Sequence, residues 1–128
     1  MVELAVTLPF LLLLLLATVD VGRLFYVYVG MQNAAREGAA YGAIHPTWWA
    51  AAAPNANGDP RNITYVARQE LSGDTSLVVT ISCTAACASS TTLAGNTITV
   101  STARPFALYT LFVLPSLTLG TSATAVIQ

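Results

Sequence analysis

Residues that could do chemistry are few in this chain and stand far apart in the sequence. His45 is the only histidine, no serine or cysteine has a base and an orienting acid near it, and no glycine-rich phosphate loop occurs. A nucleophile needs such partners before it can act, and phosphate binding commonly uses such a loop. We therefore predict that the protein is not an enzyme and holds no cofactor.

Cys83 and Cys87 are the only cysteines, and three residues separate them. Closing so short a loop with a disulfide would contribute roughly 2 kcal/mol in the entropic model, and it fits an exported domain better than a cytosolic one. Two free buried thiols are the alternative. We expect no metal site, because His45 is far away in the sequence and no further thiol exists.

Charged residues flank an uncharged apolar run, Leu4 to Val19, near the start of the chain. Glu3 precedes the run, where an unpaired buried carboxylate would be costly, so we predict that it pairs with the amino terminus of a neighbouring subunit. A solvated acid that suits the positive end of the helix dipole is the alternative. Asp20 and Arg23 lie three residues apart and are predicted to form an ion pair at the membrane boundary.

The run contains sixteen residues, six of them consecutive leucines, and as a helix it would be about 24 Å long. This length is slightly short of the roughly 30 Å hydrocarbon core of a bilayer, but it suffices for a membrane anchor. A signal peptide would carry a basic segment before the run and a small-residue cleavage site after it. Because neither is seen, we expect the run to belong to the mature protein.

The helical pattern continues beyond the run without a proline until Pro46, which predicts one helix over residues 1–43. Its first half is apolar all round, whereas its second half carries polar residues. Pro9 lies in the first half, where proline typically costs about 3 kcal/mol or more, so we predict a kink or a short non-helical stretch over residues 6–9. Such a break would let the first turn reorient towards a neighbour in an assembly.

Small residues recur along this helix at spacings of four or eight and form a ridge. Ridges of this kind let two helices approach closely, which matters most in lipid. We predict that the ridge makes subunit contacts, and packing against the protein's own head is the alternative. Its members are Gly22, Gly30, Ala34, Gly38 and Gly42.

Residues 44–128 are predicted to form an exposed head, which makes the fold class α+β. Residues 44–58 have the composition of a loop. A short helix is predicted to follow, with Asp59 as its cap, Pro60 at its first position and Gly73 at its end.

An antiparallel sheet of about three strands is predicted for the rest of the head. Residues 77–82 and 97–102 alternate in the manner of a hairpin, and residues 122–127 alternate again. Residues 106–119 are apolar, but they are too few, and too broken by Pro115, for a second membrane span. We expect them to serve as packing surface.

Two further patterns in the head leave alternatives open. Asn62 begins a glycosylation triplet, although such triplets are common by chance and this one falls in a predicted helix. Trp48 and Trp49 are candidates for interfacial anchors or contacts with a neighbour, and ordinary packing of their loop is equally plausible.

Composition separates this chain from most soluble domains. Of its 128 residues, 55% are hydrophobic and only 9% are charged, and five arginines stand against six acids with no lysine. The net charge of −1 provides no footprint for nucleic acid and no polybasic membrane patch. We predict no nucleic-acid partner, and the excess apolar surface needs lipid or other subunits to cover it.

The first third of the chain resembles a known family. The segments Val2-Glu3-Leu4-Ala5, Leu8-Pro9-Phe10, Val19-Asp20-Val21-Gly22-Arg23 and residues 32–39, followed in the tail by a Thr-Val-Ser strand and a Pro-Phe pair, resemble TadE-like pilin-like proteins. These proteins are associated with tight-adherence (Tad) pili, a branch of the type IV pilin superfamily. Superfamily members lose a short basic leader, which leaves a glutamate as fifth residue. The matching residue is Glu3, so either the chain begins two residues into the mature protein or the cleavage register differs.

The resemblance implies a structural subunit of a helical surface filament, anchored in the cytoplasmic membrane before assembly and forming the filament core through residues 1–43 afterwards. Its expected partners are identical subunits in a homopolymer, the prepilin peptidase and the pilus assembly machinery. A minor pilin-like or membrane-anchored accessory component of that apparatus is the main alternative. A membrane-stalked adhesin is a third, but residues 44–95 display no recognisable binding site.

Overall fold

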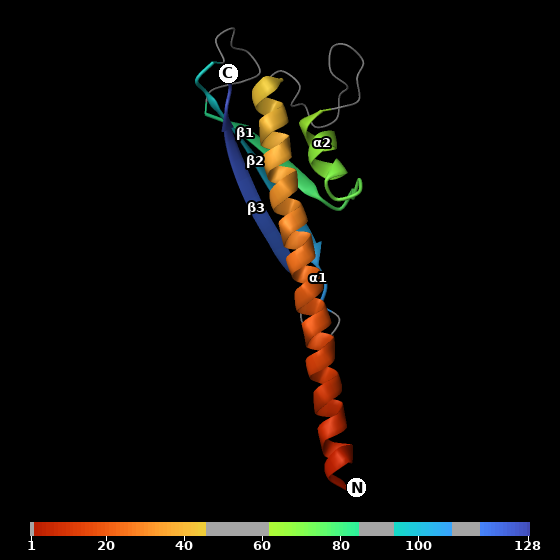
Figure 1. Cartoon of the computed structure of the whole chain (residues 1–128). Coiled ribbons are helices and arrows are strands. Elements are labelled where there is room, and N and C mark those ends of the chain that lie inside the picture. Colours follow the sequence, from red (N-terminus) through yellow and green to blue (C-terminus); the bar gives the residue numbers. More distant parts are fainter. Residues whose placement is uncertain (1, 46–61, 85–93, 109–115) are drawn as a thin grey trace.

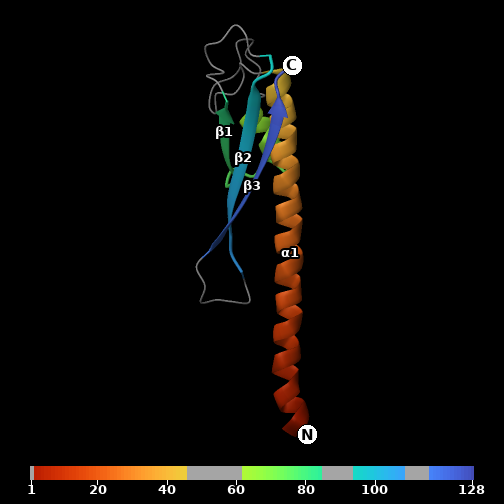
Figure 2. The same ribbon diagram turned by 90° about the vertical axis from the view of Figure 1, so that its left-hand side faces the viewer.

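The computed structural model describes residues 2–45, 62–84, 94–108 and 116–128, in the order helix, helix, and three strands. The long helix α1 runs over Val2–Ile44, and the short helix α2 over Ile63–Gln69. The strands are β1 over Val78–Cys83, β2 over Thr97–Phe106 and β3 over Leu117–Val126. Figures 1 and 2 show a sheet and α2 packed against the second half of α1, while the first half projects beyond them. The α+β prediction is confirmed.

Helix α1 is continuous through Pro9, so the predicted non-helical stretch over residues 6–9 is wrong. Proline removes one amide donor from the helix, and α1 nevertheless continues across it from Leu8 to Phe10. Near the proline, the hydroxyl of Thr7 donates a hydrogen bond to the carbonyl oxygen of Leu4 at 3.4 Å. The predicted length of α1 is otherwise confirmed to within one residue at its end.

Helix α2 begins later than the sequence predicts. Asn62 has an extended backbone (φ −121°, ψ 174°), and its side-chain oxygen accepts a hydrogen bond of 2.7 Å from the amide of Tyr65. This is the geometry of a helix N-cap. Asn62 is therefore the cap that was predicted at Asp59, and Ile63 is the first helical residue that was predicted at Pro60. Asp59 and Pro60 lie outside the described residues.

The three strands form one antiparallel sheet in the order β1-β2-β3, as predicted. Val100 lies opposite Ile81 of β1 and Ala123 of β3, so these three side chains share one face. Along β2 the side chains alternate between buried and half-buried from Thr97 to Thr102. Both later strands are longer than predicted, since β2 continues through residues 103–105 to Phe106 and β3 begins at Leu117. Phe106 and residues 117–119 of the expected packing segment 106–119 thus belong to the sheet.

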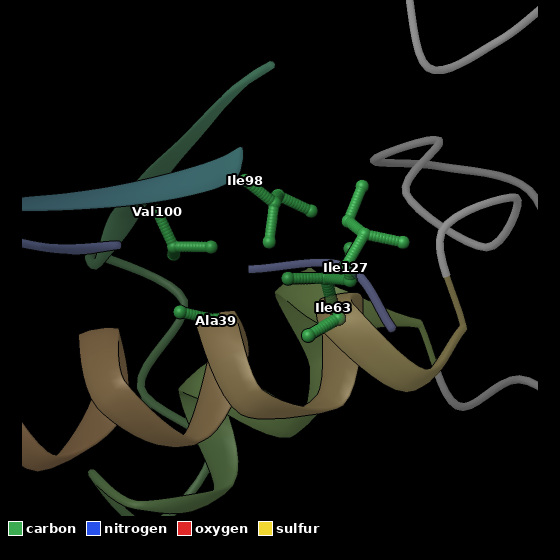
Figure 3. Close-up of a cluster of buried hydrophobic side chains, with 6 residues drawn as sticks. Ala39, Ile63, Ile98, Val100 and Ile127 are labelled. Carbon is green, nitrogen blue, oxygen red and sulfur yellow. The ribbon is translucent and has the colours of Figure 1, made fainter. Parts of the chain in front are cut away.

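The core lies between the inner face of the sheet, α2 and α1. Figure 3 shows Ala39 of α1 facing Ile98 and Val100 of β2, with Ile63 of α2 and Ile127 closing the cluster. All five are at most 2% exposed. A second cluster lies nearer the middle of α1 and contains Met31, Ala34, Ala67 and Leu77. Both clusters use only the second half of α1.

Strand β2 follows α1 closely and runs in the opposite direction. A methyl group placed at Gly42 would lie 2.6 Å from the side chain of Ile98, and one placed at Gly38 would lie 3.3 Å from Val100. Further along, the buried Thr102 hydroxyl donates to the carbonyl oxygen of Met31 at 3.3 Å. The last residue of β2, Phe106, has its ring beneath the guanidinium of Arg23, 5.4 Å from the ring centroid.

Candidate functional site: the projecting half of α1

The candidate site is a helical surface rather than a pocket. Every large apolar side chain from Leu4 to Leu16 is between 50% and 69% exposed. Figures 1 and 2 show this part of α1 extending away from the sheet. Because successive residues of a helix point in all directions, the exposure is found on every side of the helix.

This surface is unsuited to water. Burying one large aliphatic or aromatic side chain is worth about 1.5–3 kcal/mol, and the projecting half of α1 carries ten of them from Leu4 to Leu16. Among the described residues, α1 is long and apolar enough to cross a membrane by length and composition. Only 6% of its most apolar stretch is buried inside the protein. The segment therefore supports membrane anchoring, and its surface could equally be covered by other helices.

The predicted ion pair stands where the projecting half of α1 meets the head. A guanidinium nitrogen of Arg23 lies 3.5 Å from a carboxylate oxygen of Asp20. Asp20 is 3% exposed, whereas the Arg23 side chain is 43% exposed and also covers the ring of Phe106. The pair thus joins the helix to the end of the sheet. Burial of the Asp20 carboxylate was not predicted from the sequence.

Glu3 and Pro9 lie in the first turns of α1, as predicted. The side chain of Glu3 is outside the described part of the structure, so its pairing with a neighbour stays a prediction. Pro9 is exposed and available to a neighbouring subunit or to lipid.

The ridge of small residues divides between two surroundings. Ala34 and Gly38 are buried under the protein's own head, and a methyl group at Gly30 would lie 2.8 Å from Leu71. The predicted subunit contact through Gly30, Ala34 and Gly38 is therefore corrected, because α2, its C-terminal turn and β2 already cover them. Gly22 differs, since a methyl group there would meet nothing within 4 Å.

An exposed apolar face on α1 beyond Asp20 was missed by the sequence analysis. Val21, Phe25 and Tyr26 are 66%, 67% and 76% exposed. They adjoin the projecting half of the helix and are separated from it only by the ion pair. Aromatic residues one to two turns past an apolar run are the signal that could have revealed this face.

The remaining predicted residues belong to the head. Cys83 is disulfide-bonded, and the only other cysteine of the chain is Cys87, which lies outside the described residues. Asn62 is 8% exposed and occupied in capping α2, a position that argues against a glycan, although glycosylation stays a prediction. Trp48 and Trp49 also lie outside the described residues.

Comparison with known proteins adds one match. Residues 1–40 match the TadE family model, described as TadE-like protein. The resemblance noted in the sequence is thereby confirmed over the first third of the chain. No curated protein matches the chain. No solved structure matches it either.

The TadE-like segment covers the whole projecting half of α1 and most of the half that packs on the head. The match suggests a Tad pilus-associated component, and the TadE-like family is not a family of enzymes. The described residues contain no group of three or more histidine, cysteine, aspartate or glutamate side chains that could hold a metal ion. The chemistry of the site is therefore that of an apolar helix surface.

Proposed function

We propose that the chain is a structural subunit of a Tad-type, type IV pilus-like surface filament that polymerises through the projecting half of α1. The observation that carries the proposal is the exposure of residues 4–19 on every side of a helix that the head leaves uncovered. Lipid covers this surface before assembly, and the same segments of other subunits cover it in the filament.

Hydrophobicity cannot drive the transfer from lipid to filament, because lipid and a core of leucine side chains are about equally apolar. Close packing at Gly22, pairing of Glu3 with a neighbour's amino terminus, and the energy supplied by the assembly machinery must decide it. A repeated contact between different surfaces of identical subunits does not close on itself and yields a filament. Identical subunits are thus the proposed partners, with the prepilin peptidase and the cytoplasmic membrane acting earlier.

The alternative is a minor pilin-like or membrane-anchored accessory component, which would keep residues 4–19 in lipid permanently. Electron microscopy of purified surface material, with peptide identification of its main band, separates the two functions. We expect this chain in the band. Recovery only from detergent-solubilised membranes would favour the accessory role.

Replacement of Glu3 tests the mechanism of assembly. Glu3→Ala should leave membrane insertion intact and reduce filament yield, because it removes an acceptor for a neighbour's amino group without shortening the anchor. Glu37→Ala is the matched control, since Glu37 is an exposed acid on the head-covered half of the same helix. Equal filament yields from the two variants would contradict the pairing.

A further inference from the structure

The position of the sheet along the axis of α1 is determined by contacts at both ends of β2. Gly42 of α1 meets Ile98, and Arg23 meets Phe106. Eight strand steps span about 26 Å, and nineteen helix steps span about 28 Å, so the two elements run side by side over the same distance. Phe106, at the end of β2, is therefore level with Arg23.

A bilayer anchored on α1 must reach this level. A hydrocarbon core of roughly 30 Å needs about 20 helical residues, and counting from Leu4 brings its far boundary to Arg23. Residues 4–19 alone cover only about 24 Å. Any tilt of the helix increases the number of residues required. The exposed side chains of Val21 and Phe25 supply apolar surface at this depth.

The end of the sheet at this depth is itself apolar. Phe106 lies opposite Leu117 in the β2–β3 register, and Leu117 is 47% exposed. Ala107 is exposed and Leu108 is half-buried. From Phe106 to Leu117 the sequence contains no charged residue. A connection between these two strand ends starts and finishes at the level of Arg23.

The charges near this end are placed as a membrane boundary requires. Asp20 lies on the anchor side of the level of Phe106. It is 3% exposed and paired with Arg23, whose long side chain can reach towards the headgroups. Above Phe106, Arg104 forms a 2.6 Å ion pair with Asp74. Arg104 lies two strand residues from Phe106, about 7 Å further from the hydrocarbon and at the depth of the lipid headgroups.

We propose that the β2–β3 end of the head, where Ala107, Leu108 and Leu117 lie exposed or half-buried beside the buried Phe106, is a second lipid-contacting surface that enters the outer edge of the bilayer beside α1. The proposal rests on membrane anchoring through residues 4–19, and its occupant is the acyl-chain region of the lipid. It lies beside the apolar side chains that α1 exposes on both sides of Asp20. Two separate insertions would fix the orientation of the head on the membrane and would both have to be withdrawn during assembly.

Depth measurements on the full chain test this inference. Nitroxide labels would be attached through Leu117→Cys and Ala107→Cys at the sheet end, Leu12→Cys in the anchor and Thr124→Cys on the exposed outer face of β3. The protein would be inserted into vesicles of phosphatidylcholine and phosphatidylglycerol. Collision rates with oxygen, which concentrates in hydrocarbon, and with a water-soluble nickel complex then report the depth of each label. Unsubstituted protein, in which Cys83 is disulfide-bonded, is the labelling control.

We expect the labels at positions 117 and 107 to give high oxygen-to-nickel ratios like that at position 12, and the label at 124 to give a low one. Ratios at 117 and 107 that equal the ratio at 124, while position 12 stays in lipid, would overturn the second contact and leave the anchor standing. A low ratio at position 12 would overturn the anchor and, with it, this inference. Two neighbouring probes guard against local disturbance by one substitution.

Discussion

The two halves of α1 differ in surroundings although they form one unbroken helix. From Leu4 to Val19 almost every side chain is exposed, whereas from Asp20 to Ile44 buried or half-buried residues return every three or four positions. The first half consists mainly of leucine, which gives no face of the helix a preference. The second half places small residues on one face, from Gly30 to Ala43, and larger or polar residues on the other, so one face can approach a sheet closely and the other can remain uncovered.

Side-chain size, rather than hydrophobicity alone, therefore decides which half binds the head. Gly38 and Gly42 let β2 approach α1 closely enough for Val100 and Ile98 to fill the space above them. A leucine in either position would hold the strand away. The run of leucines is therefore left for surroundings that lie outside the protomer.

The largest expected effect comes from shortening one buried side chain of the head, compared with shortening one exposed side chain of the projecting half of α1. Ile98→Ala should lower the free energy of unfolding of the head by about 2–5 kcal/mol, because Ile98 of β2 is fully buried in the cluster that packs against α1. Leu12→Ala is the matched control and should leave it unchanged, since Leu12 is 52% exposed beyond the head. Urea unfolding of the detergent-solubilised chain, followed by near-ultraviolet circular dichroism, measures both. Equal losses would mean that the halves are not energetically separate.

A smaller effect is expected from adding volume to the ridge. Gly42→Leu should cost about 1–3 kcal/mol of head stability, because the new side chain must displace Ile98 and Ile63. In the control Gly22→Leu the side chain enters open space, and the better helix former should leave the head as stable as before. A melting temperature that falls as far for position 22 as for position 42 would contradict the division of the ridge.

Loss of the α2 cap affects a contact that lies within α2 and away from α1. Asn62→Ala should cost about 1 kcal/mol, because the amide of Tyr65 loses its acceptor. Asn33→Ala is the control, since Asn33 is exposed in the middle of α1 and caps nothing. Chemical denaturation reads out both variants. If the cap does not stabilise the head, Asn62→Ala and the wild type will unfold at the same midpoint concentration of denaturant.

The smallest effect concerns pH. A hydrogen bond of 2.8 Å from the Ser76 amide, aided by the Ser76 hydroxyl and by Arg104, holds the pKa of Asp74 below its ordinary value of 3.8. A lowered folded-state pKa stabilises the fold above the ordinary value, and this contribution is lost as the pH falls through the folded-state pKa. Head stability should therefore decline below about pH 4, and Asp74→Asn should flatten that part of the profile. If Asp74→Asn leaves the pH dependence of head stability unchanged, Asp74 is not the cause of the decline at low pH.

Much of the fold could be predicted because its signals are local. The absence of proline between Arg23 and Pro46 predicts the length of α1, and period-two alternation predicts all three strands. The start of α2 could not be predicted, because Asp59 and Pro60 form a stronger local signal than Asn62. What selects Asn62 is the packing of Ile63 and Ala67 against α1, which depends on residues distant in the sequence.

The site was less predictable than the fold. The projecting surface follows directly from the leucine run. Which surface packs on the small-residue ridge could not be predicted. A neighbouring element of the same chain and a helix of another subunit both require small residues at the contact. Burial of Asp20 depends on tertiary contacts at the junction of helix and head, and no spacing within α1 encodes them.

The arrangement of β3 alongside α1 has a mechanical consequence. Figures 1 and 2 place the amino terminus at the tip of the projecting half and the carboxyl terminus at the opposite end of the molecule. Strand β3 is held by β2 along its full length, and Ile127 adds two backbone hydrogen bonds, of 2.8 Å to Asn96 and 3.0 Å to Gly95. A pull between the two termini would therefore load these bonds together in shear, parallel to the long axis, instead of opening them one at a time.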